Sequence, residues 1–499
     1  MRPKPITKCR VCFNEKLKYV GGLGKIPVND FTNTPRSGLK WPLELVYCPR
    51  CTLLQFKHDP PTNLYEDHYW YESAINSAIV KDLKEIAGYV LTYANDGDIL
   101  LDIGSNDSTL LRFYPDKFIK IGCEPAKNLW DKAVKGIDIL IKDTWNYERF
   151  IWAIHKGKQI LAQRKEGRIF SGSLNSNESS QEREKTFELE RRSIKLFFDS
   201  SLDFKNTRKS KKENLSKLQY DERFKESRMG MDGKRETDKR FESLHASLCK
   251  VSPRIRRYRS KSFGNKAKAI TAIAMLYDLP DPNKFVGDIK QSLTPDGIFI
   301  AQLMTLQPMI ENNDIGNICH EHIEFYSYKS LVTLYERNGL EIYKVETNNI
   351  NGGSYRLFAR HYKTGSIKFK EKEYTLKDFK DFFQRAEANK KALVTFLRVA
   401  KTNGQKVYGY GASTKGNLIL SYYGITQKQL QGIVDVNESK IGRFMVGSKI
   451  PIVSEEAYKK ADFLWILPWG FLDYFIDKEV DWLQKGGKFV VSTPHFKII

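Results

Sequence analysis

The stretch from Ile99 to Leu111, which reads ILLDIGSNDSTLL, constrains the fold more than any other part of the chain. Three apolar residues run into Asp102, a turn of small residues follows, and an apolar pattern resumes at Leu110. This order predicts a buried parallel strand, a tight turn and the start of a helix. A helix start presents free backbone N–H groups, so the turn is suited to hold a polar ligand. The alternative is a strand, turn and helix that bind nothing.

A second strand is expected over 119–122, and Cys123, Glu124 and Pro125 follow it. A carboxylate after the second strand of such a unit is placed to accept hydrogen bonds from ribose hydroxyls. The two strands together predict a doubly wound α/β sheet with a site for an adenosine-containing ligand. Apolar runs at 269–277 and 297–303, with a helix beginning near Pro282 between them, indicate later strands of the same sheet.

A second strand–loop–helix unit begins near Lys406, with strands expected over 406–411 and at 433–435. The loop between strand and helix reads GASTKG and ends at Gly416. It is neither a P-loop nor a complete G-x-G-x-x-G motif. We interpret this part as a Rossmann-like domain that holds a phosphate, and binding of NAD remains the weaker alternative.

Two C-x-x-C pairs occupy the N-terminal region, Cys9 with Cys12 and Cys48 with Cys51. Four thiolates close a tetrahedral site for structural Zn²⁺, and the alternative is two unconnected thiol pairs. A redox role is disfavoured because no βαβ pattern surrounds either pair. The remaining cysteines are scattered, as expected in a reducing compartment. With no signal peptide or apolar membrane span in evidence, we expect a cytoplasmic protein without a membrane partner.

The net charge of +22 is concentrated in one segment. Residues 151–268 hold 31 Lys and Arg against 16 Asp and Glu, and they include a Ser- and Asn-rich tract. We interpret 151–265 as a basic, largely disordered insertion. An arm that binds RNA or acidic partners is the alternative.

Two clusters of side chains suit chemistry. Tyr69 and Tyr71 belong to an aromatic segment that forms either core packing or the wall of a polar pocket. His320, Glu321 and His322 are consecutive, which suits proton transfer or a metal. Consecutive residues do not share a helix face, so a metalloprotease helix is excluded. The alternative is that these histidines are structural.

In this order along the chain, the motifs resemble the sugar C-methyltransferases of deoxysugar biosynthesis. These enzymes use S-adenosylmethionine (SAM) and methylate a carbon beside a ketone on a nucleotide-linked sugar. The resemblance spans about 1–150 and 266–499 and is carried by the two C-x-x-C pairs, Tyr69-Trp-Tyr-Glu-Ser73, Asp102-Ile-Gly-Ser-Asn-Asp107, Glu124-Pro125, His320-Glu-His322, Asn351-Gly-Gly-Ser354 and Tyr410-Gly-Ala-Ser-Thr-Lys-Gly416.

The resemblance implies a class I methyltransferase sheet between a zinc-binding module and a Rossmann-like domain. The implied domains are a zinc module at 1–65, a methyltransferase domain at 66–150 and 266–365, the insertion at 151–265, and a Rossmann-like domain at 366–499. SAM is expected on Asp102, Gly104, Asn106, Asp107, Glu124 and Pro125. The catalytic residues implied are His322 as the base, with His320, Glu321, Tyr69 and Tyr71, and the sugar nucleotide is expected on Asn351, Tyr410 and Lys415.

Two positions depart from the family pattern. Ser108 stands where the family has glycine and is expected to crowd the methionine part of SAM. Cys319 stands where a tyrosine is common and removes a hydroxyl. Two other functions remain open at this stage. They are methylation of oxygen or nitrogen on a small acceptor, and a zinc-containing nucleic-acid-binding protein. We expect no nucleic-acid partner beyond non-specific contacts of the insertion, and the oligomeric state is left open.

Overall fold

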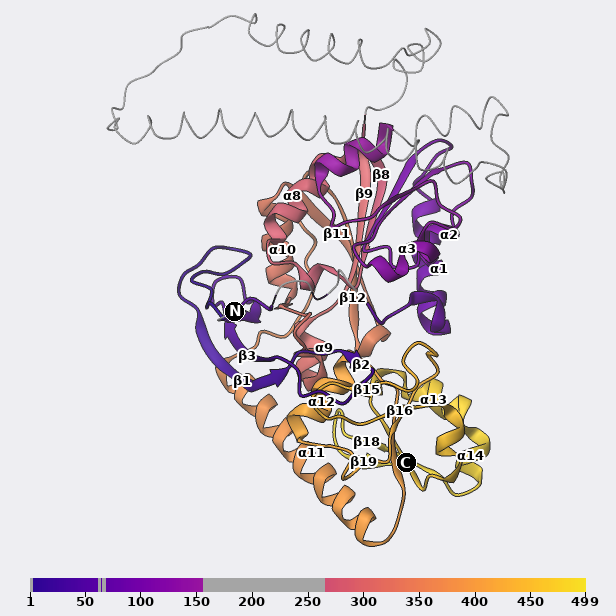
Figure 1. Ribbon diagram of the computed structural model, residues 1–499. Helices are drawn as coiled ribbons and strands as arrows, with labels where there is room; N and C mark the ends of the chain where they lie inside the picture. The colour runs from indigo at the N-terminus through magenta and orange to yellow at the C-terminus, as the bar shows by residue number, and fades with distance from the viewer. Residues whose placement is uncertain (1–2, 62–63, 65–68, 156–264) are drawn as a thin grey trace, which may run out of the picture. The chain divides into compact units, whose positions relative to one another are not determined.

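The computed structural model describes residues 3–61, 64, 69–155 and 265–499. These residues form a four-stranded, a seven-stranded and a six-stranded sheet, together with one two-stranded pairing (Figure 1). No helix among them is long and apolar enough to cross a membrane.

The seven-stranded sheet has the order β11-β12-β9-β8-β5-β6-β7. The strands from β9 to β7 run parallel, and β12 and β11 complete the sheet as antiparallel strands. Their bounds are β5 Ile99–Ile103, β6 Ile119–Cys123, β7 Ile139–Ile141, β8 Ala267–Ile273, β9 Leu293–Met304, β11 Leu340–Asn348 and β12 Ser354–His361. Strand order reverses between β5 and β8, so the loop after β5 opens at the point where doubly wound sheets bind ligands. The predicted strand that runs into Asp102 and the predicted strand over 119–122 are confirmed.

Helices cover both faces of this sheet, as Figure 1 shows, with α1, α2 and α3 on one side and α8 and α10 on the other. The sequence of β5 dictates this, because Leu100 packs in one apolar cluster with α1 while Leu101 packs in another with α8 and α10. Capping side chains start three of the helices, namely Asn76 for α1, Asp281 for α8 and Ser327 for α10. The helices of this part are α1 Ser77–Leu91, α2 Thr109–Arg112, α3 Trp130–Ala133, α8 Pro282–Ser292, α9 Leu306–Glu311 and α10 Tyr328–Arg337.

The connection from β7 to β8 contains the predicted insertion. A helix covers 147–155, and Ala153 and Ile154 in it are fully buried. Packed chain therefore extends at least to residue 155, past the expected boundary at 151. The rest of the predicted disordered insertion lies outside the described residues.

The four-stranded sheet of the N-terminal module has the order β1-β3-β4-β10. Its strands are β1 Lys18–Pro27, β3 Lys40–Tyr47, β4 Leu54–Phe56 and β10 Glu324–Phe325. Glu324 pairs with Gln55 and Phe325 with Leu54, so the fourth strand comes from the segment directly after the His-Glu-His motif. The module thus fixes one end of the loop that holds the predicted catalytic histidine.

The third sheet has the order β16-β14-β13-β17-β18-β19 and follows a long helix, α11 Leu376–Thr402. Its strands are β13 Val407–Tyr410, β14 Ile433–Val434, β16 Ile452–Val453, β17 Phe463–Ile466, β18 Lys488–Val491 and β19 Lys497–Ile498, and its other helices are α12 Thr414–Tyr423, α13 Leu472–Lys478 and α14 Val480–Gln484. Only β19 is antiparallel to its neighbour. A short pairing of β2 Phe31–Thr32 with β15 Phe444–Met445 joins this part to the N-terminal module.

Candidate active site

Backbone hydrogen bonds connect the turn after β5 to the end of β6. The N–H groups of Gly104 and Ser105 both donate to the Cys123 carbonyl at 2.9 Å. The Asn106 N–H donates to Oε2 of Glu124 at 2.8 Å, and the Ala126 N–H donates to Oε1 at 2.8 Å. Each carboxylate oxygen has a second acceptor position, so Glu124 keeps the capacity to bind ribose hydroxyls.

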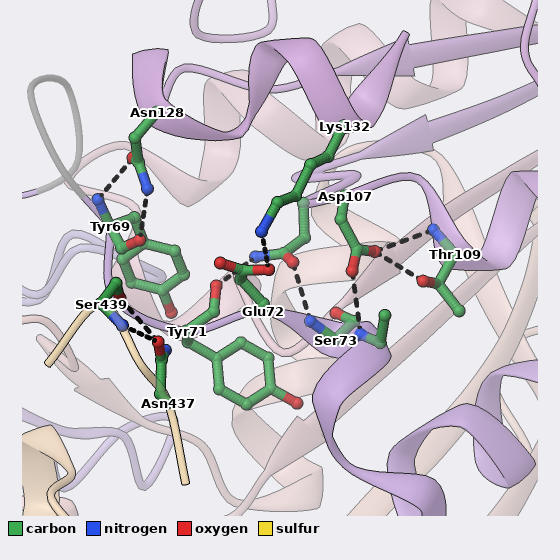
Figure 2. A network of polar contacts seen from close by, with 12 residues as sticks. Tyr69, Tyr71, Glu72, Ser73, Asp107, Thr109, Asn128, Lys132, Asn437 and Ser439 are labelled. Atoms are coloured by element: carbon green, nitrogen blue, oxygen red, sulfur yellow. Dashed lines mark hydrogen bonds and ion pairs between the residues drawn. The ribbon is translucent and has the colours of Figure 1, made fainter. Parts of the chain in front are cut away.

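Asn106 and Asp107 hold the chain's own backbone. Oδ1 of Asn106 accepts the Ser73 N–H at 2.9 Å, and its Nδ2 donates to the Tyr71 carbonyl at 3.0 Å. Oδ2 of Asp107 accepts the Ala74 N–H at 2.9 Å. Figure 2 shows Asp107 and Ser73 of this network beside Tyr71. The two residues expected to contact SAM therefore position the segment that carries the two tyrosines.

The tyrosines stand side by side at this edge, with the ring centres of Tyr69 and Tyr71 6.4 Å apart (Figure 2). Asn128 fixes Tyr69 by bonding both its N–H and its carbonyl, each at 2.9 Å. Burial raises the pKa of the Tyr69 hydroxyl, and the charges of Asp278 and Glu321 add to the effect. Tyr69 thus lies within the electrostatic reach of the His-Glu-His loop.

Asp102, at the end of β5, is buried and accepts the Thr271 hydroxyl at 2.6 Å. Burial raises the pKa of Asp102 to about 7, and the nearby carboxylates of Glu124 and Asp107 act in the same direction. Burial also raises the pKa of Glu124, whereas the N–H groups of Ala126 and Asn106 lower it. This edge of the sheet is rich in acceptors, which fits a cofactor that presents hydroxyl, amino and sulfonium groups.

Ser108 has a left-handed backbone conformation, with φ 62° and ψ 26°. Its hydroxyl is buried and has no hydrogen-bond partner among the described residues. Glycine adopts this conformation at no steric cost. Backbone strain therefore explains why the family pattern has glycine here, and this explanation does not require that Ser108 crowd SAM.

We expect Ser108→Gly to stabilise the protein by about 1 kcal/mol, because it removes strain and an unsatisfied hydroxyl at the expense of some chain entropy. Urea unfolding without SAM measures this change. A lower midpoint than wild type would contradict the strain explanation. Tighter SAM binding by the same variant would support the crowding explanation as well.

His322 is the histidine that faces the site. Its Nδ1 lies 2.9 Å from Oδ1 of Asn317 and 3.2 Å from the Asn317 carbonyl oxygen. Its ring packs edge-on against Tyr277, with ring centres 4.5 Å apart. Burial and the positive charge of Lys415 together lower the pKa of His322 to about 3, although the hydrogen bond with the Asn317 backbone opposes the shift. The imidazole is therefore neutral throughout the physiological range.

Glu321 precedes His322, and the pKa of its carboxyl is shifted in the opposite direction. Burial raises the pKa of its carboxyl to about 7, although hydrogen bonds with Cys319 and Asn29 lower it. Asn29 comes from the loop between β1 and β2, and it also donates to Thr414 at 3.0 Å and accepts from Asn417 at 2.8 Å. One asparagine of the N-terminal module thus links Glu321 to the start of α12.

His320 points away from this cluster. Its Nε2 lies 3.5 Å from the Trp41 carbonyl on β3, and only 2% of the residue is exposed. Burial lowers its pKa to about 4, and hydrogen bonds with the Trp41 and Ile26 backbone oppose that shift. The expectation of a catalytic role for His320 is not supported, because the side chain is used to attach the loop to the N-terminal module.

Lys415 brings a positive charge from α12 to the loop that carries His322. Its Nζ lies 3.0 Å from Oδ2 of Asp314 and 3.3 Å from the Asn351 carbonyl. The predicted pair of Asn351 and Lys415 is therefore brought together. Tyr410 is not part of it, because its hydroxyl donates to Glu479 at 2.6 Å and lies 2.9 Å from Glu455, within the six-stranded sheet's own polar cluster.

The loop before α12, which we expected to hold a phosphate, forms hydrogen bonds with other groups of the chain. Ser413 caps the helix by accepting the Gly416 N–H at 3.0 Å, and Asp435 accepts the Ala412 N–H at 2.8 Å. Lys440 lies 3.7 Å from the same Asp435 carboxylate. Asp435 thus holds this loop in the same way that Glu124 holds the turn after β5, by accepting backbone N–H groups on both carboxylate oxygens.

The four N-terminal cysteines converge, with their sulfurs within 4.8 Å of one another. Cys9 and Cys51 are 3.5 Å apart at sulfur, as are Cys12 and Cys48, close to the roughly 3.8 Å expected between thiolates on one tetrahedral Zn²⁺. The two turns match, since the residue after each second cysteine, Phe13 or Thr52, has φ near +60°. The alternative of two unconnected thiol pairs is therefore excluded by the geometry.

Sequence reasoning missed Asn29, Tyr277, Asp314 and Asn317. Asn317 lies in the same short segment as His322, and an amide five residues before a candidate base was an available signal. Asn29 and Tyr277 come from distant elements, and no local pattern marks them.

Comparison with known families identifies the class of enzyme. A family model described as a methyltransferase domain matches residues 71–345, more than half of the chain. The chain belongs to the SAM-dependent methyltransferases. A second model, described as a C-methyltransferase C-terminal domain, matches residues 349–494. Together these matches identify a C-methyltransferase, and the seven-stranded sheet is its class I methyltransferase fold.

The methyltransferase is similar over nearly its whole length to the C-methyltransferase NovU of Streptomyces niveus. The two are 23% identical over 517 aligned positions that cover 99% of this chain and 97% of the relative. Among solved structures, the mitomycin 7-O-methyltransferase MmcR is 11% identical, with a TM-score of 0.26, and covers 58% of this chain and 56% of its own. The magnesium protoporphyrin IX methyltransferase ChlM of Synechocystis PCC 6803, with bound SAM, is 8% identical, with a TM-score of 0.25, and covers 57% and 79%. Neither structural likeness bears on substrate.

Proposed function

We propose that this methyltransferase adds a methyl group to a carbon beside the ketone of a nucleotide-linked deoxysugar. The observation that carries the proposal is the geometry of His322, whose Nδ1 is held by Asn317 while Tyr277 packs against its ring. The near full-length similarity to a C-methyltransferase supports carbon as the acceptor.

Carbon becomes a nucleophile only after the proton beside the carbonyl is removed. In the proposed step the C–H bond breaks, the proton passes to His322, and the electron pair forms an enolate. SAM, when bound, would supply the electrophilic methyl group for this carbon, and S-adenosylhomocysteine would leave as the S–CH3 bond breaks. A base with a pKa near 3 is always neutral but weak, so much of the barrier must be lowered by stabilising the enolate oxygen.

We propose Lys415 and the tyrosines Tyr69 and Tyr71 as the groups that provide this stabilisation. The ammonium group of Lys415 is held in place by Asp314 and by the Asn351 carbonyl. The raised pKa of Tyr69 keeps its hydroxyl protonated, so that it donates a hydrogen bond. Glu321 orients the loop, and its raised pKa makes it the competing candidate for the base.

For the cofactor, we propose that Glu124 holds the ribose of SAM, with Asp102, Gly104 and Pro125 forming the surrounding edge. Asn106 and Asp107 act there mainly by holding the aromatic segment. Four cysteine sulfurs at tetrahedral spacing support a structural Zn²⁺ in the N-terminal module.

Glu124→Ala is expected to weaken SAM binding by about 1–3 kcal/mol, because buried hydroxyls lose their acceptor. Isothermal titration calorimetry with SAM measures the change. Glu124→Gln retains the size of the side chain and separates loss of the charge from loosening of the turn. Glu148→Ala removes an exposed carboxylate of the same domain and is the matched control. An unchanged affinity in Glu124→Ala would remove this residue from the cofactor site.

The proposed function is tested by incubating the protein with SAM carrying a ¹³C-labelled methyl group and a panel of nucleotide-linked 4-keto sugars. A new methyl signal coupled to a ring carbon in the ¹³C spectrum is the expected result. A methyl group found on oxygen or nitrogen would contradict carbon methylation and would identify the protein as an O- or N-methyltransferase. Absence of transfer to every sugar, together with transfer to a non-sugar ketone, would overturn the sugar assignment.

A further inference from the structure

We propose that Asn317 is a positioning residue that keeps the proton of neutral His322 on Nδ1 and so leaves Nε2 as the atom that accepts the substrate proton. This inference rests on the proposed role of His322 as the base. It adds which nitrogen reacts and which side chain determines that choice.

The two acceptors at Nδ1 carry the argument. One is Oδ1 of Asn317 at 2.9 Å, and the other is the backbone carbonyl oxygen of the same residue at 3.2 Å. A carbonyl oxygen only accepts hydrogen bonds, so Nδ1 must be the donor whichever way the amide is turned. In neutral imidazole, a proton on Nδ1 leaves the lone pair on Nε2.

Nε2 is the nitrogen open to a substrate. No hydrogen-bond partner for it is found in the described parts of the chain, and His322 is not fully buried. Tyr277 packs edge-on against the ring at 4.5 Å and restricts its rotation. With Nδ1 bonded on one side and Tyr277 on another, the ring has one orientation in which Nε2 meets a bound molecule.

Asn317 is itself rigidly held. It ends a 3₁₀ turn, Ile315–Asn317, and its N–H donates to the Asp314 carbonyl at 3.1 Å. Only 3% of the residue is exposed. Gly316 lies against α12 so closely that an added Cβ would stand 3.1 Å from Ile419 and 3.3 Å from Lys415. The packing of α12 therefore fixes the turn that presents the amide.

The choice of an amide has a chemical consequence. When Nε2 takes the substrate proton, both ring nitrogens carry hydrogen, and the Nδ1–H remains bonded to two neutral oxygens. Neutral acceptors orient the imidazolium without strongly stabilising its charge. A carboxylate at the same place would stabilise the imidazolium and make the histidine a stronger base. Asn317→Asp should therefore raise the basicity of His322. A purely structural role of Asn317 would not produce that effect.

The experiment uses the full-length protein with ¹⁵N-labelled histidine, in wild type, Asn317→Ala and Asn317→Asp. Magic-angle-spinning spectra of sedimented protein report which ring nitrogen of His322 is protonated, with His322→Gln identifying the signals. Exchange of the substrate proton in heavy water is measured in parallel, with S-adenosylhomocysteine in place of SAM. Asn312→Ala is the matched control, because its amide donates to the Gly352 carbonyl at 3.1 Å and not to His322.

We expect wild-type His322 to be protonated on Nδ1. Asn317→Ala keeps only the longer contact of Nδ1 with the backbone carbonyl, at 3.2 Å, so we expect both tautomers in that variant and exchange slower by about 10–100-fold. In Asn317→Asp, the added charge should raise the pKa of His322 by about 1–3 units, so exchange should fall as the pH drops through about 6 to 4, a decline absent from wild type. Asn312→Ala should match wild type in both readouts. Protonation of wild-type His322 on Nε2, or wild-type exchange in Asn317→Ala, would overturn the inference.

Asn317→Asp differs little in size from wild type and keeps the test valid if Asn317→Ala fails to fold. An Asn317→Asp profile without the decline would also count against the inference. Failure of the proposed function is recognised separately. If His322→Gln exchanges as fast as wild type, His322 is not the base, whereas the ring-nitrogen spectra still decide whether Asn317 sets its tautomer.

Discussion

Replacing His322 with alanine should slow exchange of the substrate's proton by about 10²–10⁴-fold, the range for removal of a positioned acid or base. A nucleotide-linked 4-keto sugar is incubated in heavy water with S-adenosylhomocysteine in place of SAM, so that proton removal is observed without methyl transfer. Loss of exchange with retained substrate affinity identifies a base, whereas loss of both indicates that His322 only binds the sugar.

His320→Ala is the matched control, because it removes the neighbouring imidazole that faces the Trp41 carbonyl. We expect its exchange rate to stay within a few-fold of wild type and its thermal stability to fall, since a buried packing group is lost. An equal loss of exchange in both variants would mean that the loop as a whole, and not His322 alone, is required.

The pH profile separates His322 from Glu321. A base must be deprotonated to act, and His322, with a pKa of about 3, is deprotonated throughout pH 5–9. If His322 is the base, this group causes no fall in rate at the acid end of that range. If Glu321 is the base, exchange should decline as the pH drops below about 7, where its carboxyl takes up a proton. Such a decline, abolished in Glu321→Gln along with most activity, would move the role to Glu321.

The local sequence predicted the central elements well because their signals are short in range. The apolar run into Asp102 and the Pro282 helix start each depend on neighbours within a few residues. The four cysteines were predicted to converge because thiolate pairs at this spacing suit one tetrahedral metal. Periodicity and pairing motifs of this kind are properties of the chain itself.

The direction of each side chain in a turn was beyond such reasoning. His320 and His322 are two residues apart, yet one faces the N-terminal module and the other faces Tyr277. Tyr410 and Lys415 flank one loop, yet only Lys415 reaches Asp314. These orientations depend on which distant elements of the fold pack against the turn. The local sequence of the turn does not specify those contacts.

The strand pairing of β10 was likewise invisible, because two residues carry no periodic pattern and their partner lies in β4. This pairing gives the zinc module a second structural role. The sequence indicated a separate structural domain at 1–65, whereas the fold makes that module the support on which the loop of Glu321 and His322 rests. Asn29 adds a second support by bonding Glu321.

Cys48→Ser is therefore expected to abolish both zinc binding and proton exchange. Serine is a poor ligand for Zn²⁺, and the free energy of metal binding in small thiolate sites is also folding free energy. Zinc analysis of the purified wild type should give one metal per chain, and the variant should give none. Without the metal, we expect β4 to lose the structure that holds it in place. The pairing of Gln55 on β4 with Glu324 on β10 should then be lost.

Displacement of a catalytic group by about 1 Å is enough to cost about 10²-fold in rate, so we expect at least that loss of exchange in Cys48→Ser. SAM binding should persist in part, because Glu124 and its turn belong to the seven-stranded sheet. Cys123→Ser is the control, since it alters a buried cysteine outside the cluster and retains a donor to the Asp143 carbonyl. A zinc-free protein that is folded and exchanges at the wild-type rate would show that His322 does not depend on the module, and the pairing of β10 would then be insufficient to position it.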